Sequence, residues 1–554
     1  MDSSRAVRRV ILDRGRKVTG WPDIDWKRSN YNVKRLQIRI AKATKESNWR
    51  KVKRLQRLLE RSFSARALAV RKVVSNKGRN TPGVDGIIWN TTEKKWNAIF
   101  EINPNNYKPK PLKRIKIPKS GKGYRPLSIP CKSDMAMQAL YQLALDPVSE
   151  TTADKNSYGF RKERSCHDAI EQCFITLATR KSVPYILEAD IKSCFDEISH
   201  QWIMNNIPMN KNILRKFLKA GYISRNKRYP THKGTPQGGI ISPTIMNMTL
   251  DGIDAEINRK FGKTERKRLG LHVVRYADDF VVLGRTIESL KQVQTTLEEF
   301  LQIRGLRLSP DKTLITEISE GFDFLGMNLR KYQKKLIIKP SKQKVKRFLK
   351  KIQATIKEYS SVSQELLIRK LNPMIRGWCN YYRHVCSKEV FAFVDYKMFW
   401  MLKRWAERRH PKKNALWIKN KYWHSIEKRN RFAVVDKKDD RVIALLLLAD
   451  KTKIIRHIKT RHEANPYLPE FEEYFNQRLY NRWLVSQTKK IKNIIKRQKS
   501  TCPLCHSDIH PEDKLELDHI ILKCEGGTDD ITNLRLLCYV CHKQRHSKRK
   551  TIIL

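Results

Sequence analysis

Two adjacent aspartates between apolar runs place the strongest constraint on this chain. The stretch from Leu271 to Gly284, LHVVRYADDFVVLG, carries Asp278 and Asp279 between two apolar arms. A strand sends neighbouring side chains to opposite faces, so two acids that serve one site are best placed at the tip of a β-hairpin. Paired carboxylates repel each other and are costly to desolvate, which indicates a divalent cation. An ordinary Asp-Asp turn between strands would have the same local sequence.

A third acid follows another apolar run. The residues YILEA from Tyr185 to Ala189 predict a short strand that ends at Asp190. An aspartate in that position is most often a helix cap. Because two-metal phosphoryl transfer needs acids from separate strands, Asp190 is also a candidate third carboxylate of the same site.

The net charge indicates the kind of partner. The 554 residues include 115 Lys and Arg against 55 Asp and Glu, a formal net charge of +60. Such an excess predicts a long polyanionic partner, a nucleic acid, bound over an extended face. The longest apolar run, Val442 to Ala449, is far shorter than the roughly 20 residues of a membrane span. The sequence therefore predicts a basic, folded, multidomain protein without a membrane partner.

Two further segments carry groups suited to phosphate or to a close backbone approach. LKRIKIPK and YRPLSIP, joined by SGKG, predict edge strands of a small subdomain because prolines flank them. Phosphate is the natural partner of their basic side chains, although a solvated hairpin would look similar. In GTPQGG, from Gly234 to Gly239, the glycines would let the backbone approach a ligand, and a plain loop before a helix is the alternative. The basic side chains are Arg114, Lys116, Lys119, Lys122 and Arg125.

Helical spacing of apolar residues predicts a basic helix pair over Val33 to Phe63 and an amphipathic helix over Lys132 to Glu150. We expect the helix pair to pack on a neighbouring domain. Its basic side could form a polyanion groove.

The C-terminal cysteines predict a metal site. Four of the eleven cysteines form two Cys-x-x-Cys pairs, Cys502 with Cys505 and Cys538 with Cys541. This spacing suits a tetrahedral zinc site in a reducing compartment better than a disulfide framework. A purely structural zinc knuckle that grips nucleic acid is one interpretation.

Taken in order, the central segments resemble the reverse transcriptase of group II intron-encoded proteins. The matching motifs, between about residues 80 and 335, are RIKIPKSGKGYRPLSIP, SYGFRKERS, ADIKSCFD, GTPQGGIISP, RYADDF, LSPDKT and FDFLGM. The resemblance implies a right-hand palm in which Asp190, Asp278 and Asp279 are catalytic and hold Mg²⁺, with the Ile191 carbonyl as a further ligand.

The same resemblance implies roles around the incoming nucleotide. Lys116 and Arg125 would hold a deoxynucleoside triphosphate, and Phe195 would be the steric gate against a 2′-hydroxyl group. Gln237 would follow the nascent base pair through its backbone, and Tyr276 would pack near the primer end.

Beyond about residue 340 the basic, helical sequence resembles the thumb and maturase region of that family. Its aromatic residues interleave with Arg and Lys; large rings of this kind are more often core than nucleobase platforms, so the basic neighbours are the better candidates for RNA contacts. The segment 445–498 resembles a DNA-binding segment, and an unspecialised basic linker is equally consistent with its composition. The aromatic residues are Trp378, Tyr381, Tyr382, Trp400 and Trp405.

The sequence around the second cysteine pair resembles the HNH nuclease motif. In this resemblance Asp518 and His542 bind Mg²⁺ or another divalent ion, His519 is the general base for water, and Asn533 orients the His519 ring. Many HNH motifs have histidine at the position of Asp518, where a carboxylate is a ligand variant. Zn²⁺ would be the structural ion of the four cysteines.

The expected fold class is α+β and multidomain: right-hand fingers and palm, a helical thumb and maturase domain, and a small ββα-metal HNH domain with a zinc site. The expected parts are a basic helical N-terminal extension (1–75), the reverse transcriptase fingers and palm (76–338), the thumb and maturase domain (339–444), a basic DNA-binding segment and linker (445–498), and the HNH endonuclease (499–554).

The expected function joins these activities. The protein would bind intron RNA to assist splicing, nick target DNA, and reverse transcribe the RNA from the nick, which is retrohoming. One alternative is an RNA-binding splicing cofactor whose enzymatic activities are dispensable; another is a freestanding reverse transcriptase in host defence or another cellular pathway. The expected compartment is the bacterial cytoplasm near the nucleoid, with an organelle as the alternative.

Overall fold

The N-terminal helices form a bundle around one long helix. A computed structural model of the chain describes residues 11–13, 16–118, 123–179, 182–436, 440–486, 489–509 and 513–550. The expected basic helix pair and the amphipathic helix are both present, and α5 packs against α1, α2 and α3. After the short strands β1 (Ile11–Asp13) and β2 (Arg16–Val18), the helices are α1 (Trp26–Lys45), α2 (Trp49–Arg61), α3 (Phe63–Ser75), α4 (Thr92–Glu101) and α5 (Lys132–Thr152).

The fingers carry a four-stranded sheet in the order β4-β3-β6-β7. The expectation of two edge strands is right for β4 and wrong for β3, which also pairs in parallel with β6 through Leu112 and Tyr222. Pro118 is the last residue of β3 and Pro126 lies in the edge strand β4, which are positions where sheets tolerate proline. The strands are β3 (Leu112–Pro118), β4 (Tyr124–Ile129), β6 (Tyr222–Ser224) and β7 (Lys227–Tyr229).

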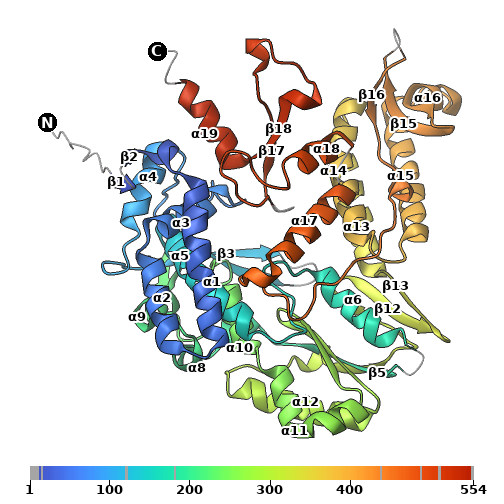
Figure 1. Cartoon of the computed structure of the whole chain (residues 1–554). Helices are drawn as coiled ribbons and strands as arrows, with labels where there is room; N and C mark the ends of the chain where they lie inside the picture. The colour runs from blue at the N-terminus through green and yellow to red at the C-terminus, as the bar shows by residue number, and fades with distance from the viewer. Residues whose placement is uncertain are drawn as a thin grey trace.

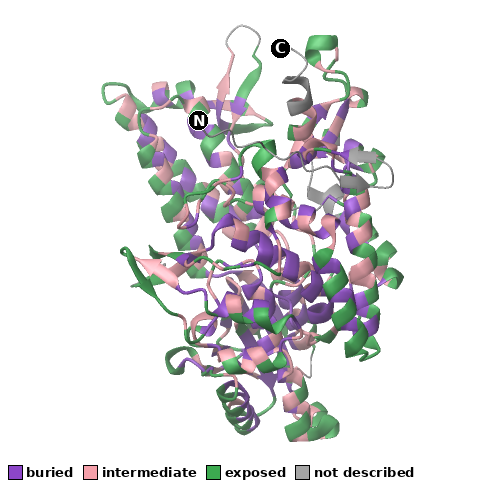
Figure 2. Ribbon diagram, turned by 90° about the vertical axis from the view of Figure 1, so that its left-hand side faces the viewer, coloured by how far each residue is buried: buried purple, intermediate pink, exposed green. Residues whose placement is uncertain are grey.

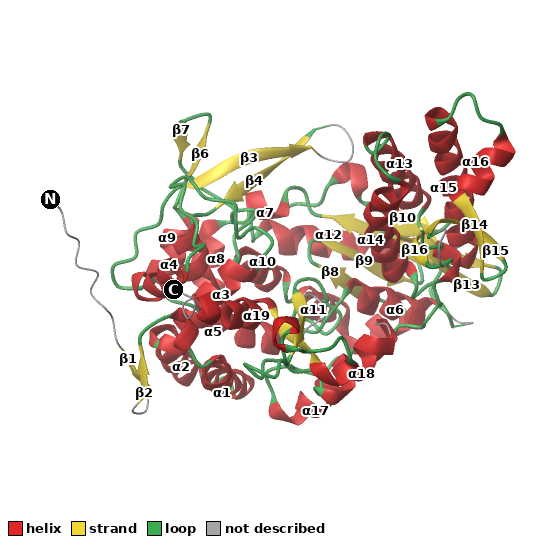
Figure 3. Cartoon of the chain, turned by 90° about the horizontal axis from the view of Figure 1, so that it is seen from above, coloured by secondary structure: helices red, strands yellow, loops and turns green. Residues whose placement is uncertain are grey.

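The palm is an antiparallel sheet in the order β10-β5-β9-β8. Successive side chains of a strand point to opposite faces of the sheet, so each palm strand contributes to two hydrophobic cores. In β9, Val282 packs in the core shared with α12, and Val281 packs in the core shared with α6. In Figure 3 the sheet lies between the N-terminal helices and the thumb. The strands are β5 (Tyr185–Asp190), β8 (His272–Tyr276), β9 (Asp279–Gly284) and β10 (Leu314–Glu317).

Helices cover the palm and connect its strands. The helices are α6 (Cys166–Leu177), α7 (Cys194–Glu197), α8 (His200–Asn206), α9 (Lys211–Leu218), α10 (Ser242–Leu250), α11 (Ile253–Arg268) and α12 (Ile287–Gln302). Figure 2 shows that the buried residues gather in the middle of the molecule.

The thumb region is less purely helical than its sequence predicts. A β-sheet, β14-β15-β16, follows its helices and includes part of the longest apolar run. The Trp405 and Phe432 rings meet at 6.0 Å between centroids, so this sheet closes the thumb core. The elements are β11 (Phe322–Phe324), β12 (Met327–Tyr332), β13 (Lys335–Pro340), α13 (Lys342–Glu358), α14 (Gln364–Tyr382), α15 (Lys388–Arg409), α16 (Ala415–Tyr422), β14 (Trp423–Ile426), β15 (Arg429–Val435) and β16 (Val442–Leu445).

The chain then returns across the palm to the N-terminal helices (Figure 1). Asp168 of α6 accepts a 2.6 Å hydrogen bond from the Thr460 amide, and its Oδ1 lies 3.1 Å from His457 Nε2. The stretch of chain that contains His457 and Thr460 is therefore bound to the palm. It leads into α17 (Glu472–Ser486) and α18 (Lys489–Arg497).

The C-terminal module has two strands and a helix, as the HNH resemblance implies. β17 (Leu515–His519) pairs antiparallel with β18 (Leu534–Cys538), and α19 (Tyr539–Lys550) follows directly. Among the described helices, none is both long and apolar enough to cross a membrane.

Candidate functional sites

The palm acids meet at one end of the central sheet. Asp190 ends β5 and Asp279 begins β9, and the two residues are direct partners in the antiparallel ladder, so their side chains share a face. Asp278 lies in the turn between β8 and β9, where Ala277 has a positive φ of 60°. The hairpin predicted from the sequence is therefore present. The bridge beside it uses the Asp190 carbonyl and the Lys192 amide, and not the Ile191 carbonyl.

The three carboxylates concentrate negative charge. Burial, reinforced by the charges of Asp278 and Asp190, raises the pKa of Asp279 to about 6. Burial and Asp190 also raise the pKa of Asp278, and the positive charge of Arg125 opposes that shift. Lys312 places its Nζ 2.8 Å from Asp190 Oδ2. Carboxylates that are buried and repel one another favour a bound cation, because the positive charge lowers the free-energy cost of ionising all of them.

A buried arginine supports the turn. Arg275 is 1% exposed, forms an ion pair with Asp251, and donates 3.3 Å hydrogen bonds to Asn247 Oδ1 and to the Ala277 carbonyl. Gly159 lies so close that a Cβ on it would be 2.3 Å from the Ala277 amide nitrogen. Neither Arg275 nor Gly159 was predicted as part of the site from the sequence. An arginine inside an otherwise apolar strand is the signal that could have found Arg275.

The two expected triphosphate ligands lie on the fingers but not on one face. Arg125 is the direct partner of Ile117 across β3 and β4, so Lys116, the neighbour of Ile117, projects from the opposite face. The register does not test whether these two long side chains reach one triphosphate, so their joint contact with it stays a prediction. Both side chains are exposed, and Arg125 is the one whose charge reaches Asp278.

The other basic side chains of the hairpin differ in their surroundings. Arg114 Nη2 lies 3.9 Å from Asp196 Oδ1, and its guanidinium carbon lies 3.8 Å from the centroid of the Tyr222 ring. Lys119 and Lys122 lie outside the described residues.

The glycine-rich segment packs on the chain itself. The side-chain amide of Gln237 donates a 3.1 Å hydrogen bond to Asp196 Oδ2. The main-chain carbonyl of Gln237 accepts a 2.7 Å hydrogen bond from the Ser128 amide. Gly238 has φ of 110°, and a Cβ there would lie 2.5 Å from the Ser128 carbonyl oxygen. The absence of a side chain at Gly238 thus lets the backbone of the glycine-rich segment lie close to β4. This contact joins the fingers to the palm.

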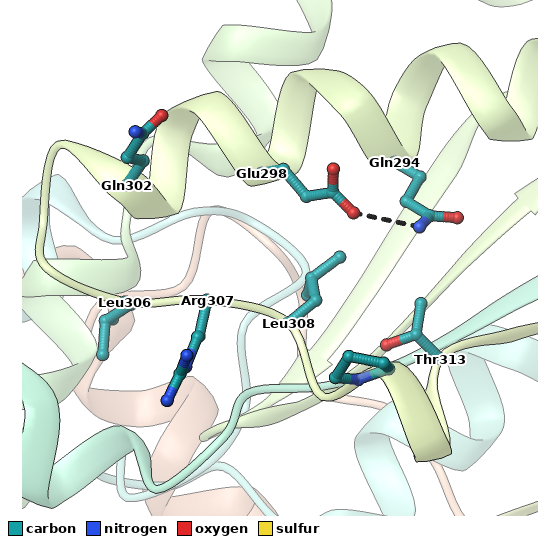
Figure 4. Close-up of a pocket in the computed structure, with 8 residues that line it drawn as sticks. Gln294, Glu298, Gln302, Leu306, Arg307, Leu308 and Thr313 are labelled. Carbon is teal, nitrogen blue, oxygen red and sulfur yellow. Dashed lines mark hydrogen bonds between the residues drawn. The ribbon is translucent and has the colours of Figure 1, made fainter.

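Tyr276 is the ladder partner of Asp279, and Phe195 lies in the short helix that follows Asp190 along the chain. Phe195 lies in α7 and is half-buried, and its carbonyl accepts a 2.6 Å hydrogen bond from the Thr235 amide. Tyr276 is the last residue of β8 and packs between the two cores of the palm. A pocket of about 580 Å³ lies beside α12, and none of the three palm aspartates lines it (Figure 4).

The aromatic residues of the maturase region are mostly structural. Tyr382 and Trp405 are both 4% exposed, and Tyr381 is half-buried and donates a 2.8 Å hydrogen bond to the Leu325 carbonyl. Trp378 is also half-buried and stacks on Phe348. Trp400 differs, because it is 39% exposed on α15.

The nuclease-like site has three candidate ligands where the sequence predicted two. Asp518 Oδ1 lies 4.0 Å from His542 Nε2 and 3.4 Å from His546 Nε2, and the three groups could hold one ion. His546 was missed, although its spacing of four from His542 places both rings on one helix face. The second oxygen of Asp518 accepts from Arg535 at 2.9 Å and from Arg545.

The charges around this group suit ligation. Burial would raise the pKa of Asp518, but the hydrogen bond from Arg535 and the charge of Arg545 hold that pKa below its usual value. Burial and the neighbouring His546 lower the pKa of His542. An ionised carboxylate and a neutral imidazole are the forms that bind metal ions.

His519 has an acidic neighbour that the sequence did not predict. His519 Nε2 lies 2.8 Å from Asp529 Oδ1. Asn533 instead bonds the loop backbone: its Nδ2 donates to the Ile521 and Thr528 carbonyls at 2.9 Å, and its Oδ1 accepts from the Ile521 amide at 2.8 Å. Asn533 thus closes the loop that follows His519, and its role in orienting the His519 ring stays a prediction.

The four cysteines of the two pairs converge as predicted. Their sulfur atoms all lie within 4.8 Å of one another, in a geometry that could hold a metal ion. Cys502, Cys505 and Cys541 are buried, and Cys538 is half-buried. Four thiolates at this separation fit a closed, tetrahedral site.

Four protein families match successive parts of the chain. They are the N-terminal domain of reverse transcriptase over residues 21–102, reverse transcriptase (RNA-dependent DNA polymerase) over 117–329, the group II intron maturase-specific domain over 345–423, and HNH endonuclease over 502–548.

Whole proteins resemble the chain as well. Protein YkfC of Escherichia coli is 32% identical over 323 residues, covering 50% of this chain and 83% of that protein. The group II intron-encoded protein LtrA of Lactococcus lactis is 28% identical over 454 residues, covering 65% of this chain and 75% of that protein. Maturase-like protein 1 of Euglena gracilis is 22% identical over 395 residues, covering 70% and 82%.

Proposed function

The chain belongs to the group II intron-encoded proteins, and from that premise we propose that it binds its intron RNA, assists splicing, nicks target DNA and copies the RNA from the nick. Its reverse transcriptase and HNH endonuclease parts make it an enzyme with two activities. The observation that carries the proposal is the direct pairing of Asp190 with Asp279 beside Asp278. This pairing places three acids at the end of one sheet.

In the palm, Asp190, Asp278 and Asp279 would hold Mg²⁺, with the Ile191 carbonyl as an added ligand. Carboxylate and carbonyl oxygens are the donors that Mg²⁺ prefers. When bound, the ions would acidify the primer 3′-hydroxyl and neutralise charge on the triphosphate. The ladder between β5 and β9 fixes two of the acids, and Arg275 fixes the turn that carries the third.

Around the nucleotide, Lys116 and Arg125 of the fingers hairpin would contact the triphosphate, and the positive charge of Arg125 already acts on Asp278. Phe195 follows the first acid by five residues and would exclude a 2′-hydroxyl group. Gln237 holds α7 to β4 and would follow the nascent pair through its backbone. Tyr276 would pack near the primer end.

In the nuclease module, Asp518, His542 and His546 would hold a divalent ion that stabilises charge on the cleaved phosphate. His519 would take a proton from water, and because Asp529 engages Nε2, we assign proton uptake to Nδ1. Asn533 would orient the His519 ring through the loop that follows His519. The four cysteines would hold structural Zn²⁺.

The two activities complement each other, because a nick supplies the 3′-hydroxyl that a polymerase extends. The compartment would be one that keeps thiols reduced, since all eleven cysteines are free. The alternative is an RNA-binding splicing cofactor whose enzymatic activities are dispensable. This alternative leaves unexplained why the palm aspartates and the Asp518, His542 and His546 group are both intact.

The proposal is tested with the full chain bound to its intron RNA, a labelled duplex carrying the target, and deoxynucleotides. The expected products are a single-strand nick and DNA extended from that nick. His519→Ala should abolish the nick while a supplied primer is still extended, and Asp278→Asn should do the reverse. Extension products without any nick would mean that another source supplies the primer.

A further inference from the structure

The cysteine cluster is contacted by an arginine from the other end of the chain. Arg71 of α3 donates to Cys538 Sγ at 3.0 Å and approaches Cys505 Sγ at 3.6 Å. Its guanidinium carbon lies 4.9 Å from the centroid of the Trp26 ring, and Trp26 is 3% exposed. One arginine is thus held between an indole of α1 and two sulfur atoms of the nuclease module.

Other contacts surround this arginine. Trp26 Nε1 donates to Gln544 Oε1 at 3.0 Å, and Gln544 donates back to the Pro22 carbonyl. Asn30 donates to Ser507 Oγ at 2.7 Å. Buried apolar residues of the module and of the N-terminal helices belong to one continuous core. Figure 1 shows the module beside these helices. We call the surface formed by Trp26, Asn30 and Arg71 the docking face.

The negative charge of the four-cysteine cluster with a bound metal ion explains why an arginine lies beside its sulfur atoms. Four thiolates around a divalent ion carry a formal charge of −2, and burying that charge is costly unless hydrogen bonds and a counter-charge accompany it. Arg71 supplies both, because its guanidinium is always protonated and presents several N–H donors. Neutral thiols without a metal ion would offer the same arginine only weak acceptors.

We propose that the four-cysteine centre, besides holding the module together, is the anchor by which the docking face holds the nuclease. Arg71 recognises the negative charge of the loaded centre, so metal binding and docking stabilise each other. Coupling of this kind is reciprocal: whatever loosens the docking must weaken metal retention by the same factor. The inference goes beyond the proposed function and holds whether or not the module cuts DNA.

The test uses the full-length protein loaded with Zn²⁺. Arg71→Met removes the guanidinium while keeping an apolar side chain, and Arg54→Met makes the same change at an exposed arginine of α2. Zinc affinity is measured by competition with a colorimetric chelator. We expect Arg71→Met to raise the zinc dissociation constant about 10- to 100-fold, the usual effect of losing an outer-shell partner, and Arg54→Met to leave it unchanged.

Hydrogen exchange supplies a second readout. Because the module itself loses its fold with the metal, the informative peptides are those of α1 and α3. Chelation should raise exchange across Trp26 and Arg71 in the wild type and change it little in Arg71→Met, where the module is already loose. Unchanged exchange in the wild type, or wild-type zinc affinity in Arg71→Met, would overturn the proposal.

A variant on the far side of the interface covers the case in which Arg71→Met fails to fold. Gln544→Ala leaves all four cysteines and Arg71 in place and removes the bonds to Trp26 and Pro22. It should raise both α1 exchange and the zinc dissociation constant. Increased α1 exchange with unaltered zinc affinity would show that docking and metal binding are independent, which refutes the coupling.

Discussion

The Nζ atom of Lys312 lies 2.8 Å from Oδ2 of Asp190, so a lysine already neutralises one of the proposed magnesium ligands. A positive charge there opposes any other cation at the same oxygen. Lys312→Met should therefore lower the Mg²⁺ concentration that gives half-maximal primer extension, whatever happens to the maximal rate. Magnesium titrations of wild type and variant measure this. A higher magnesium requirement would mean that Lys312 helps to assemble the site.

Arg275 should be essential to the palm turn. Removing one member of a buried ion pair costs about 3–5 kcal/mol, and Arg275 and Asp251 are 1% and 9% exposed. We expect Arg275→Met to lower the protection of β8 and β9 peptides from hydrogen exchange and to depress primer extension. Arg285→Met, at an exposed position just after β9, is the matched control. Wild-type protection in Arg275→Met would show that the turn stands without it.

The buried Glu60 of α2 should make stability fall with rising pH. Burial raises its pKa to about 7, against the opposing effects of Tyr141 and Arg57. The folded state thus keeps a proton that the unfolded state loses above about pH 4.5, so stability is full below that pH and is lost as pH rises through 7.

Glu60→Gln removes this dependence. The variant should be more stable than wild type at pH 8 by up to about 3 kcal/mol, since one pKa unit corresponds to about 1.4 kcal/mol. The difference should nearly vanish at about pH 4, below the pKa of the unfolded state. Hydrogen exchange of α2 at both pH values measures it. If the wild type were more stable than Glu60→Gln at pH 8, the ionised Glu60 carboxylate would have favourable charge partners in the folded state.

His546 should matter to the nuclease as much as His542 does. His546→Ala removes one of three groups gathered around a single position, so we expect loss of target nicking with full extension of a supplied primer. The exposed His506 of the same module provides the control, and His506→Ala should nick normally. Normal nicking by His546→Ala would limit the metal ligands to Asp518 and His542.

Local patterns predicted the elements that hold the chemistry. The apolar arms around Asp278 and Asp279 give the hairpin, and YILEA gives the strand that ends at Asp190. Their pairing could be expected because acids from separate strands must share one site. His546 also lay within reach of the same reasoning, through its helical spacing from His542.

Contacts between distant parts of the chain could not be predicted this way. Arg71 and Cys538 are 467 residues apart, and no local pattern says which arginine among many will meet a thiolate. The failure of Lys116 and Arg125 to share a face comes from strand register, which the turn residues and the partner strand set together. The sheet β14-β15-β16 was missed because its apolar run alone does not distinguish strand from buried helix.

The most direct test of the account is primer extension on an RNA template by the full chain and by Asp278→Asn, with Mg²⁺ and deoxynucleotides. Asn keeps the shape of the side chain and removes its charge. We predict that the variant binds intron RNA and nicks target DNA as the wild type does but extends no primer. Extension by Asp278→Asn at the wild-type rate would contradict the assignment of the palm acids as the polymerase site.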